Sequence, residues 1–179
     1  EAVAFQIDYR WNTSGDPFRA TLLGSRQLHL EQQPLEGTPI YDSVGYLFGP
    51  VPWKANGGLT FHREGWTVAW NAQYFDSQRV YDVTSTPESR ATTVLRQGAD
   101  SIPHQVYHDV FVKYRIDAAA GGFGGLLANS DLSIGISNLF DKTPPIMTNF
   151  LTTSVGAAGY SFYGNPLMRR YSLSLSKRF

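Results

Sequence analysis

Apolar and polar side chains alternate with a period of two along most of this chain. The clearest stretch places Trp66, Val68, Trp70, Ala72 and Tyr74 on one face, and the residues between them are small or polar. A period of two is the repeat of a β-strand, because successive side chains point to opposite sides of a sheet. The alternation predicts no amphipathic helix and about seven strands, at residues 2–11, 18–30, 55–62, 66–74, 109–116, 131–140 and 171–179.

Four side chains break the alternation. Leu23 and Phe111 fall among polar positions, whereas Arg26 and Lys177 fall among apolar ones. Each predicted face is therefore mainly, but not uniformly, apolar or polar.

The segments between the strands alternate in length. Two are short turns, at residues 12–17 and 62–65. They alternate with long connections, at residues 31–52, 76–104 and 141–169. A transmembrane barrel has this alternation, since its periplasmic turns are tight and its extracellular loops are long. The glycine-rich segment 117–130 is long at a short-turn position, and we interpret it as a local insertion.

The apolar face must be kept away from water, and the alternation alone allows two environments for it. In a soluble sheet this face packs on a core, whereas in a membrane barrel it contacts lipid and the polar face lines the lumen. Trp66 and Tyr74 lie eight residues apart. That spacing is ~26 Å along a strand, close to the apolar band between aromatic girdles once a tilt of about 40° is included. We therefore expect an all-β fold, an antiparallel up-and-down transmembrane β-barrel.

The composition narrows the classes of function. Lys plus Arg and Asp plus Glu number 15 each, so no basic surplus attracts nucleic acid. There are no cysteines, which excludes disulfides and thiolate metal sites. No apolar run is long enough for a transmembrane helix, and no signal peptide opens the chain. Because Glu1 leads directly into the first predicted strand, we expect the chain to be part of a longer protein.

A five-residue motif ends the predicted strand 131–140. It comprises Asn138, Leu139, Phe140, Asp141 and Lys142. The motif resembles the end of the penultimate strand in TonB-dependent receptors, a family of outer-membrane transporters.

The final strand also resembles the last strand of this family. Its apolar face and terminal aromatic residue are formed by Tyr171, Leu173, Leu175 and Phe179. The resemblance assigns these residues to the C-terminal signal that the barrel assembly machinery reads. It covers the last part of the chain closely and the first half only through the alternation.

The resemblance implies a barrel of about 22 strands around a plug domain. This chain would supply about seven C-terminal strands, since it contains neither a plug domain nor a TonB box. The implied function is uptake of a siderophore or another scarce nutrient across the bacterial outer membrane. The implied partners are the lipid bilayer, the plug and remaining strands, the barrel assembly machinery, and the TonB–ExbB–ExbD complex reached through the missing N-terminal part.

Aromatic side chains in the long connections are the candidate ligand contacts, because aromatic rings can stack on a ligand. They are Tyr41, Tyr46, Phe48, Trp53, Tyr160, Phe162 and Tyr163. The competing interpretation is that they pack the loops together or belong to the outer aromatic girdle. Charges on the polar face are expected to line the lumen or to contact the plug: Asp8, Arg10, Asp109, Lys113 and Arg115.

No catalytic, cofactor or metal site is predicted. The sequence lacks a Gly-x-Ser-x-Gly nucleophile motif, and no Lys-Ser or Lys-Thr pair directly follows the glycines at 121–125. The spacing of His104 and His108 would suit a metal ion on a helix, but Pro103 and the following strand argue against a helix there. We therefore predict a protein that is not an enzyme.

Two other classes of function stay open on the sequence alone. A passive outer-membrane channel or adhesin would share the barrel but have no plug. A soluble β-sandwich or lipocalin-like binding module would share the alternation but cover its apolar face with protein. A fold in which the same polypeptide covers Trp66, Val68 and Trp70 would exclude the barrel.

Overall fold

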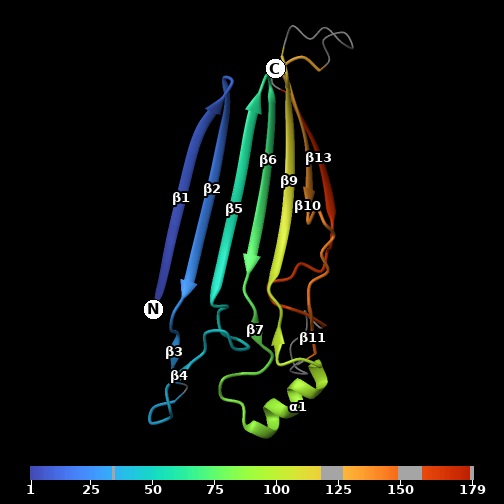
Figure 1. Cartoon of the computed structure of the whole chain (residues 1–179). Coiled ribbons are helices and arrows are strands. Elements are labelled where there is room, and N and C mark those ends of the chain that lie inside the picture. Colours follow the sequence, from blue (N-terminus) through green and yellow to red (C-terminus); the bar gives the residue numbers. More distant parts are fainter. Residues whose placement is uncertain (34, 118–126, 149–158, 178–179) are drawn as a thin grey trace.

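The computed structural model describes residues 1–33, 35–117, 127–148 and 159–177. Seven long antiparallel strands form one sheet in the order β1-β2-β5-β6-β9-β10-β13, so each pairs with the next long strand along the chain (Figure 1). Their bounds are Ala2–Thr13, Asp16–Gln27, Trp53–Arg63, Trp66–Phe75, Gln105–Ile116, Ser130–Ser137 and Arg170–Lys177. The prediction of an all-β chain with about seven strands is confirmed.

Two of the connections are two-residue turns at the same end of the sheet. Ser14 and Gly15 join β1 to β2, with φ angles of 53° and 92°, and Glu64 and Gly65 join β5 to β6, with φ angles of 45° and 84°. Positive φ at both positions gives a turn whose twist matches the flanking strands, and glycine adopts it at no steric cost. We call this end of the sheet the turn end and the opposite end the loop end.

The register aligns the apolar positions of all seven strands on one side of the sheet, here called the apolar face. One row across it pairs Tyr9, Ala20, Leu59, Trp70, Val110, Ile136 and Tyr171 in strand order. The other side, the polar face, carries the residues between them. All four tryptophans of the chain lie on the apolar face, at positions 11, 53, 66 and 70.

The apolar face has no second protein layer over it among the described residues. Trp66 is 47% exposed and Trp70 is 39% exposed, and several other large side chains on this face are at least as open. None of the buried hydrophobic side chains of the described residues lies there. The described residues therefore do not form a sandwich around their own apolar face.

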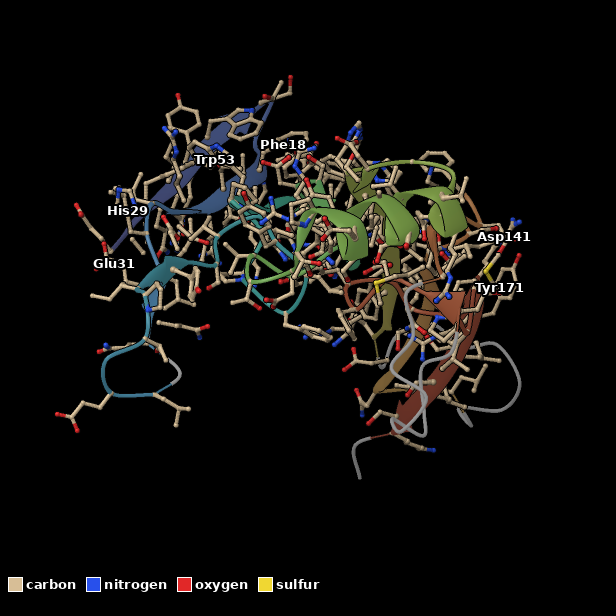
Figure 2. All side chains as sticks on the ribbon, turned by 90° about the horizontal axis from the view of Figure 1, so that it is seen from below. Phe18, His29, Glu31, Trp53, Asp141 and Tyr171 are labelled. Carbon is tan, nitrogen blue, oxygen red and sulfur yellow. The ribbon has the colours of Figure 1, made fainter. Side chains whose placement is uncertain are left out.

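The polar face is the hollow side of the sheet. Figure 2, which looks from the loop end, shows the sheet bent between β1 and β13. Three hollows of the structure are lined mainly by side chains of the polar face, such as Asn56, Asn71 and Gln73. The bend thus turns the apolar face outward and the polar face inward.

The three long connections pack together into a small core at the loop end. They carry short strand pairs, β3 (Glu31–Gln32) with β4 (Tyr41–Asp42), β7 (Gln78–Arg79) with β8 (Ser101–Ile102), and β11 (Ile146–Met147) with β12 (Gly159–Tyr160). Each connection contributes to the core, which comprises Leu47, Val80, Ile102 and Met147. We call this group the loop core.

The expectation that the chain has no helix is wrong. Helix α1 (Pro87–Gln97) lies in the second long connection (Figure 1). Thr86 caps its first turn by accepting a hydrogen bond from the Ser89 backbone N–H, and Gly98 ends it with a φ of 74°. No helix among the described residues is long and apolar enough to cross a membrane.

Several predicted strand ends need correction. The second strand stops at Gln27 rather than residue 30, because the chain turns there toward β3. The sixth stops at Ser137, since Asn138 has a φ of 54° that a strand cannot continue through. The fifth begins earlier, at Gln105. Part of the glycine-rich segment, residues 118–126, lies outside the described residues.

Candidate binding site on the concave face

A large hollow lies on the polar face at the loop end of β1, β2, β5 and β6. Its volume is about 490 Å³, which falls in the range of small-molecule sites. Its lining is largely uncharged, and Lys54 is the one cation there among the described residues. The polar-face side chains in the lining are Ala4, Gln6, Leu23, Ser25, Lys54, Asn56, Gln73 and Phe75.

Tyr163 reaches over this part of the polar face from the third long connection. Its ring stacks on Phe75 with the centroids 5.0 Å apart. The ammonium of Lys54 lies 4.9 Å from the centroid of the same ring. A lysine and an aromatic ring in contact can bind an anionic, partly aromatic group, since each contributes one part of that recognition.

Two of the predicted aromatic clusters meet at the loop end. Phe48 comes from the first long connection and Phe162 from the third, and their ring centroids lie 6.1 Å apart. Both rings are more than half exposed. Exposed aromatic rings held side by side offer a stacking surface, so this pair stays a candidate ligand contact.

The other predicted aromatic residues are placed differently. Tyr46 packs against Tyr81, Tyr41 belongs to β4, and Tyr160 belongs to β12. They take part in packing or pairing within the connections. This placement agrees with the alternative interpretation given above for loop aromatics.

The expected position of Trp53 in a long connection is wrong. Trp53 is the first residue of β5 and lies on the apolar face, with the Arg26 guanidinium 5.3 Å from its ring centroid. The contact also accounts for Arg26, which breaks the apolar pattern, because an arginine at the end of a strand can stack its flat group on an indole.

A buried polar network positions the third connection, and sequence analysis missed it. The Gln105 side-chain amide donates to the Ser161 hydroxyl at 2.5 Å, and the Tyr107 hydroxyl donates to the Gln105 carbonyl oxygen at 2.7 Å. All three side chains are buried. Because Ser161 precedes Phe162 and Tyr163, this network sets where the two aromatic rings lie.

The five-residue motif forms a tight turn at the end of β10. The Asn138 side chain accepts from the Lys142 backbone N–H at 2.8 Å and donates to the Lys142 carbonyl at 2.9 Å. The Leu139 backbone N–H donates to the His108 carbonyl at 2.6 Å. Phe140 lies edge-on against His108, with the centroids 5.0 Å apart. The motif is thus a structural element that fixes how the chain leaves β10.

Asp141 ties this turn to the start of β13. Its carboxylate accepts the Arg169 backbone N–H at 2.9 Å and pairs with the Arg169 guanidinium at 3.4 Å. These contacts, the backbone hydrogen bond first, hold the pKa of Asp141 below its usual range, although desolvation opposes the shift.

The lowered pKa of Asp141 predicts a loss of stability in acid. Its stabilisation is complete above the ordinary carboxyl pKa, near 4, and is lost as the pH falls through the folded-state pKa. We expect the thermal denaturation midpoint of the full-length parent protein to fall less between about pH 6 and about pH 3 in Asp141→Asn than in the wild type. Equal falls in the two proteins would contradict this role.

The last strand presents the expected residues on the apolar face. Tyr171, Leu173 and Leu175 are all exposed there and pair with Ile136, Ile134 and Leu132 of β10. Phe179 lies outside the described residues. Their role as an assembly signal stays a prediction.

The histidines and acidic side chains of the described residues do not form a metal site. Within the described ranges, no three His, Cys, Asp or Glu side chains gather closely enough to hold a metal ion. His104 packs on Tyr74 and His108 on Trp70, both on the apolar face. A comparison of the chain with protein-family models, curated proteins and solved structures found no match.

Proposed function

We propose that this chain forms the C-terminal strands of the barrel of a TonB-dependent receptor in the bacterial outer membrane. The receptor takes up a siderophore or another scarce nutrient, energised by the TonB complex. The observation that carries the proposal is the bare apolar face, which extends over seven strands that bend around a polar hollow. An apolar sheet face of this size is unstable in water and stable in lipid.

The lengths of the connections also support the proposed barrel. Two of the three connections at one end of the sheet are two-residue turns, as at the periplasmic side of a barrel, and the other end has the long connections 31–52, 76–104 and 141–169, as at the cell surface. The candidate ligand contacts, Phe48, Phe162 and Tyr163, belong to the long connections. They therefore face the medium from which a nutrient would come.

Tryptophan fluorescence tests the membrane part of the proposal. Because all four tryptophans lie on the apolar face, we expect lipids with brominated acyl chains to quench them in the parent protein reconstituted in vesicles. The Trp70→Phe variant should lose part of the tryptophan emission that the brominated lipids quench in the wild type. If it instead removes emission that brominated lipids leave unquenched, Trp70 does not contact acyl chains.

Uptake measurements test the transport part. We expect accumulation of the nutrient by cells that express the parent protein to require an intact TonB complex. Phe48→Ala and Phe162→Ala should weaken uptake at limiting nutrient, whereas Tyr41→Ala should not. Uptake that persists without TonB would support a passive channel, and absence of any uptake together with cell binding would support an adhesin.

The soluble alternative makes a different prediction. A β-sandwich or lipocalin-like module would be monodisperse without detergent, since its apolar face would be covered. The exposure of Trp66 and Trp70 argues against such a module. A monodisperse, detergent-free parent protein would overturn the barrel proposal.

A further inference from the structure

A second, smaller hollow lies on the polar face, where the third long connection folds over the loop ends of β6, β9, β10 and β13. Its volume is about 130 Å³. That is below the ~300–1,000 Å³ of sites that hold a whole small molecule, and it suits one polar group of a larger ligand. We call it the small hollow.

Two charged side chains of opposite sign line the small hollow. Asp109 comes from β9, and Arg170 is the first residue of β13. They are the only charged groups in the lining among the described residues, and neither forms an ion pair within the described part of the chain. Elsewhere on the polar face, Asp8 and Asp131 are each paired with two cations. The small hollow therefore differs from the rest of the face in holding two unpaired charges.

The register keeps the two charged residues apart. Asp109 lies opposite Asn71 on the polar face, and Arg170 lies opposite Ser137 of β10, the strand between them. Two strand spacings separate β9 from β13, which is ~10 Å at ~4.8 Å per spacing. A group that enters the hollow between the carboxylate and the guanidinium can therefore contact both.

Both charged side chains have hydrogen-bonding capacity left for a ligand. The Oδ1 atom of Asp109 accepts the Asn138 backbone N–H at 2.8 Å, which orients the carboxylate and leaves Oδ2 without a hydrogen bond among the described residues. The guanidinium of Arg170 donates to none of the described residues. Its planar fork of N–H donors fits a carboxylate.

Uncharged polar side chains complete the lining. Gln73 and Ser137 come from the sheet, and Asn165 comes from the third connection. The side chains of Gln73 and Ser137 make no hydrogen bond within the described ranges. Asn165 uses its Oδ1 to accept the Leu167 backbone N–H at 3.0 Å, which leaves its side-chain N–H groups. Polar groups in a hollow need partners, which here are water or a ligand.

The small hollow adjoins the large one. Gln73 lines both hollows. Tyr163 lines the small hollow, and its ring stacks on Phe75 in the lining of the large hollow. A ligand with a polar group in the small hollow can therefore extend past Gln73 along the mainly uncharged lining of the large hollow.

We infer that the small hollow binds a zwitterionic amino-acid group of the ligand, in which an ammonium and a carboxylate share one carbon. Asp109 accepts hydrogen bonds from the ammonium, and Arg170 donates to the carboxylate. The remainder of the ligand lies in the large hollow. This inference deepens the proposed function by naming a chemical class of substrate, and import of that substrate rests on the proposed function.

A zwitterion fits the lining better than a group with one charge or none. An anion bound to Arg170 would lie beside the like charge of Asp109, and a cation bound to Asp109 would lie beside Arg170. An uncharged sugar could make hydrogen bonds to both residues. Hydrogen bonds with a charge on each side are stronger, and a zwitterion makes them at both ends.

Three compounds with the same side chain test the inference. L-Phenylalanine carries both charges, its amide lacks the carboxylate, and its N-acetyl derivative lacks the ammonium. We expect the purified full-length parent protein in detergent to bind L-phenylalanine at least about tenfold more tightly than either analogue, because each analogue leaves one charged side chain without its partner. The measurement is titration calorimetry up to about 10 mM ligand, with glucose as an uncharged competitor.

Single substitutions then remove each charge separately. Arg170→Gln should remove the preference over the amide and keep the preference over the N-acetyl compound. Asp109→Asn should do the reverse, and it retains an oxygen for the Asn138 backbone N–H. Arg10→Gln and Asp8→Asn are the matched controls, since they remove the same charges elsewhere on the polar face. Both controls should leave the two preferences unchanged.

Three results would overturn the inference. One is no binding of L-phenylalanine at about 10 mM. Another is equal affinity for the three compounds or displacement by glucose, which would indicate an uncharged polar site. The third is a pair of preferences that survives both Arg170→Gln and Asp109→Asn. The compound series uses native side chains, so it decides even if a variant fails to assemble. Uptake without TonB would refute the proposed transporter and leave these binding ratios unchanged.

Discussion

Leu59→Arg should strongly reduce the assembled fraction of the parent protein. Leu59 lies on the apolar face, well inside the strand β5, and is exposed. Under the proposed function this face contacts lipid, where an arginine near the middle of the bilayer costs ~2–4 kcal/mol. That cost lowers the ratio of folded to unfolded protein by roughly 30- to 1,000-fold. The measurement is the amount of heat-modifiable, folded protein in outer-membrane fractions.

The neighbouring residue gives the matched control. Thr60 lies next along β5 but on the polar face, opposite Arg19 and Ala69. Thr60→Arg should leave assembly close to that of the wild type, because the new charge meets water or a polar partner. Equal losses of assembled protein in Leu59→Arg and Thr60→Arg would show that both faces of the sheet contact the same kind of environment.

Met147→Ala should loosen the long connections without unfolding the sheet. Met147 is 2% exposed in the loop core, where its truncation removes packing against Leu47, Val80 and Ile102. Buried Met→Ala changes cost ~2–5 kcal/mol. Because the core holds all three connections together, we expect faster trypsin cleavage after the exposed Arg96 of α1 in intact cells.

Ile146→Ala is the control that separates lost packing in the loop core from a general effect of substitution in β11. Ile146 is adjacent in β11 but 61% exposed. Its truncation should leave the rate of cleavage after Arg96 unchanged, and folded protein should stay at the wild-type level in both variants. Faster cleavage in Ile146→Ala, or slow cleavage in Met147→Ala, would contradict the role of the loop core.

The long strands could be predicted because their signal is local. Alternation from Trp66 to Tyr74 depends only on which side each residue points to, and the register places these residues on one face as expected. The ends of strands were harder to predict, since they depend on single backbone angles. The φ of 54° at Asn138 ends β10, and asparagine adopts such an angle more readily than most residues.

Helix α1 was missed because its apolar positions are few. Thr93 is its one buried residue, and Leu95 points into solvent. Its capping signals were nevertheless present in the sequence, with Thr86 before Pro87 and Gly98 after the last turn. A search for caps in the long connections would have found it where a search for periodicity did not.

The candidate site was predicted only in part. Phe48, Phe162 and Tyr163 could be selected by residue type, but their partners come from distant parts of the chain. Gln105 and Ser161 are 56 residues apart, and neither has a motif that marks it as buried. Such a contact depends on how one connection folds back on the sheet, which alternation does not describe.

The loop core makes the three long connections depend on one another. Its four side chains come from three separate connections, and Gln97 of α1 also donates to the Ile146 carbonyl at 2.8 Å and accepts from the Thr148 backbone at 2.8 Å. In a chimera that receives one foreign connection, the loop core would lack the side chains of the replaced connection, and the other two connections would pack around a cavity. Under the proposed function, a change of ligand preference by loop exchange should therefore require transplanting the three connections together.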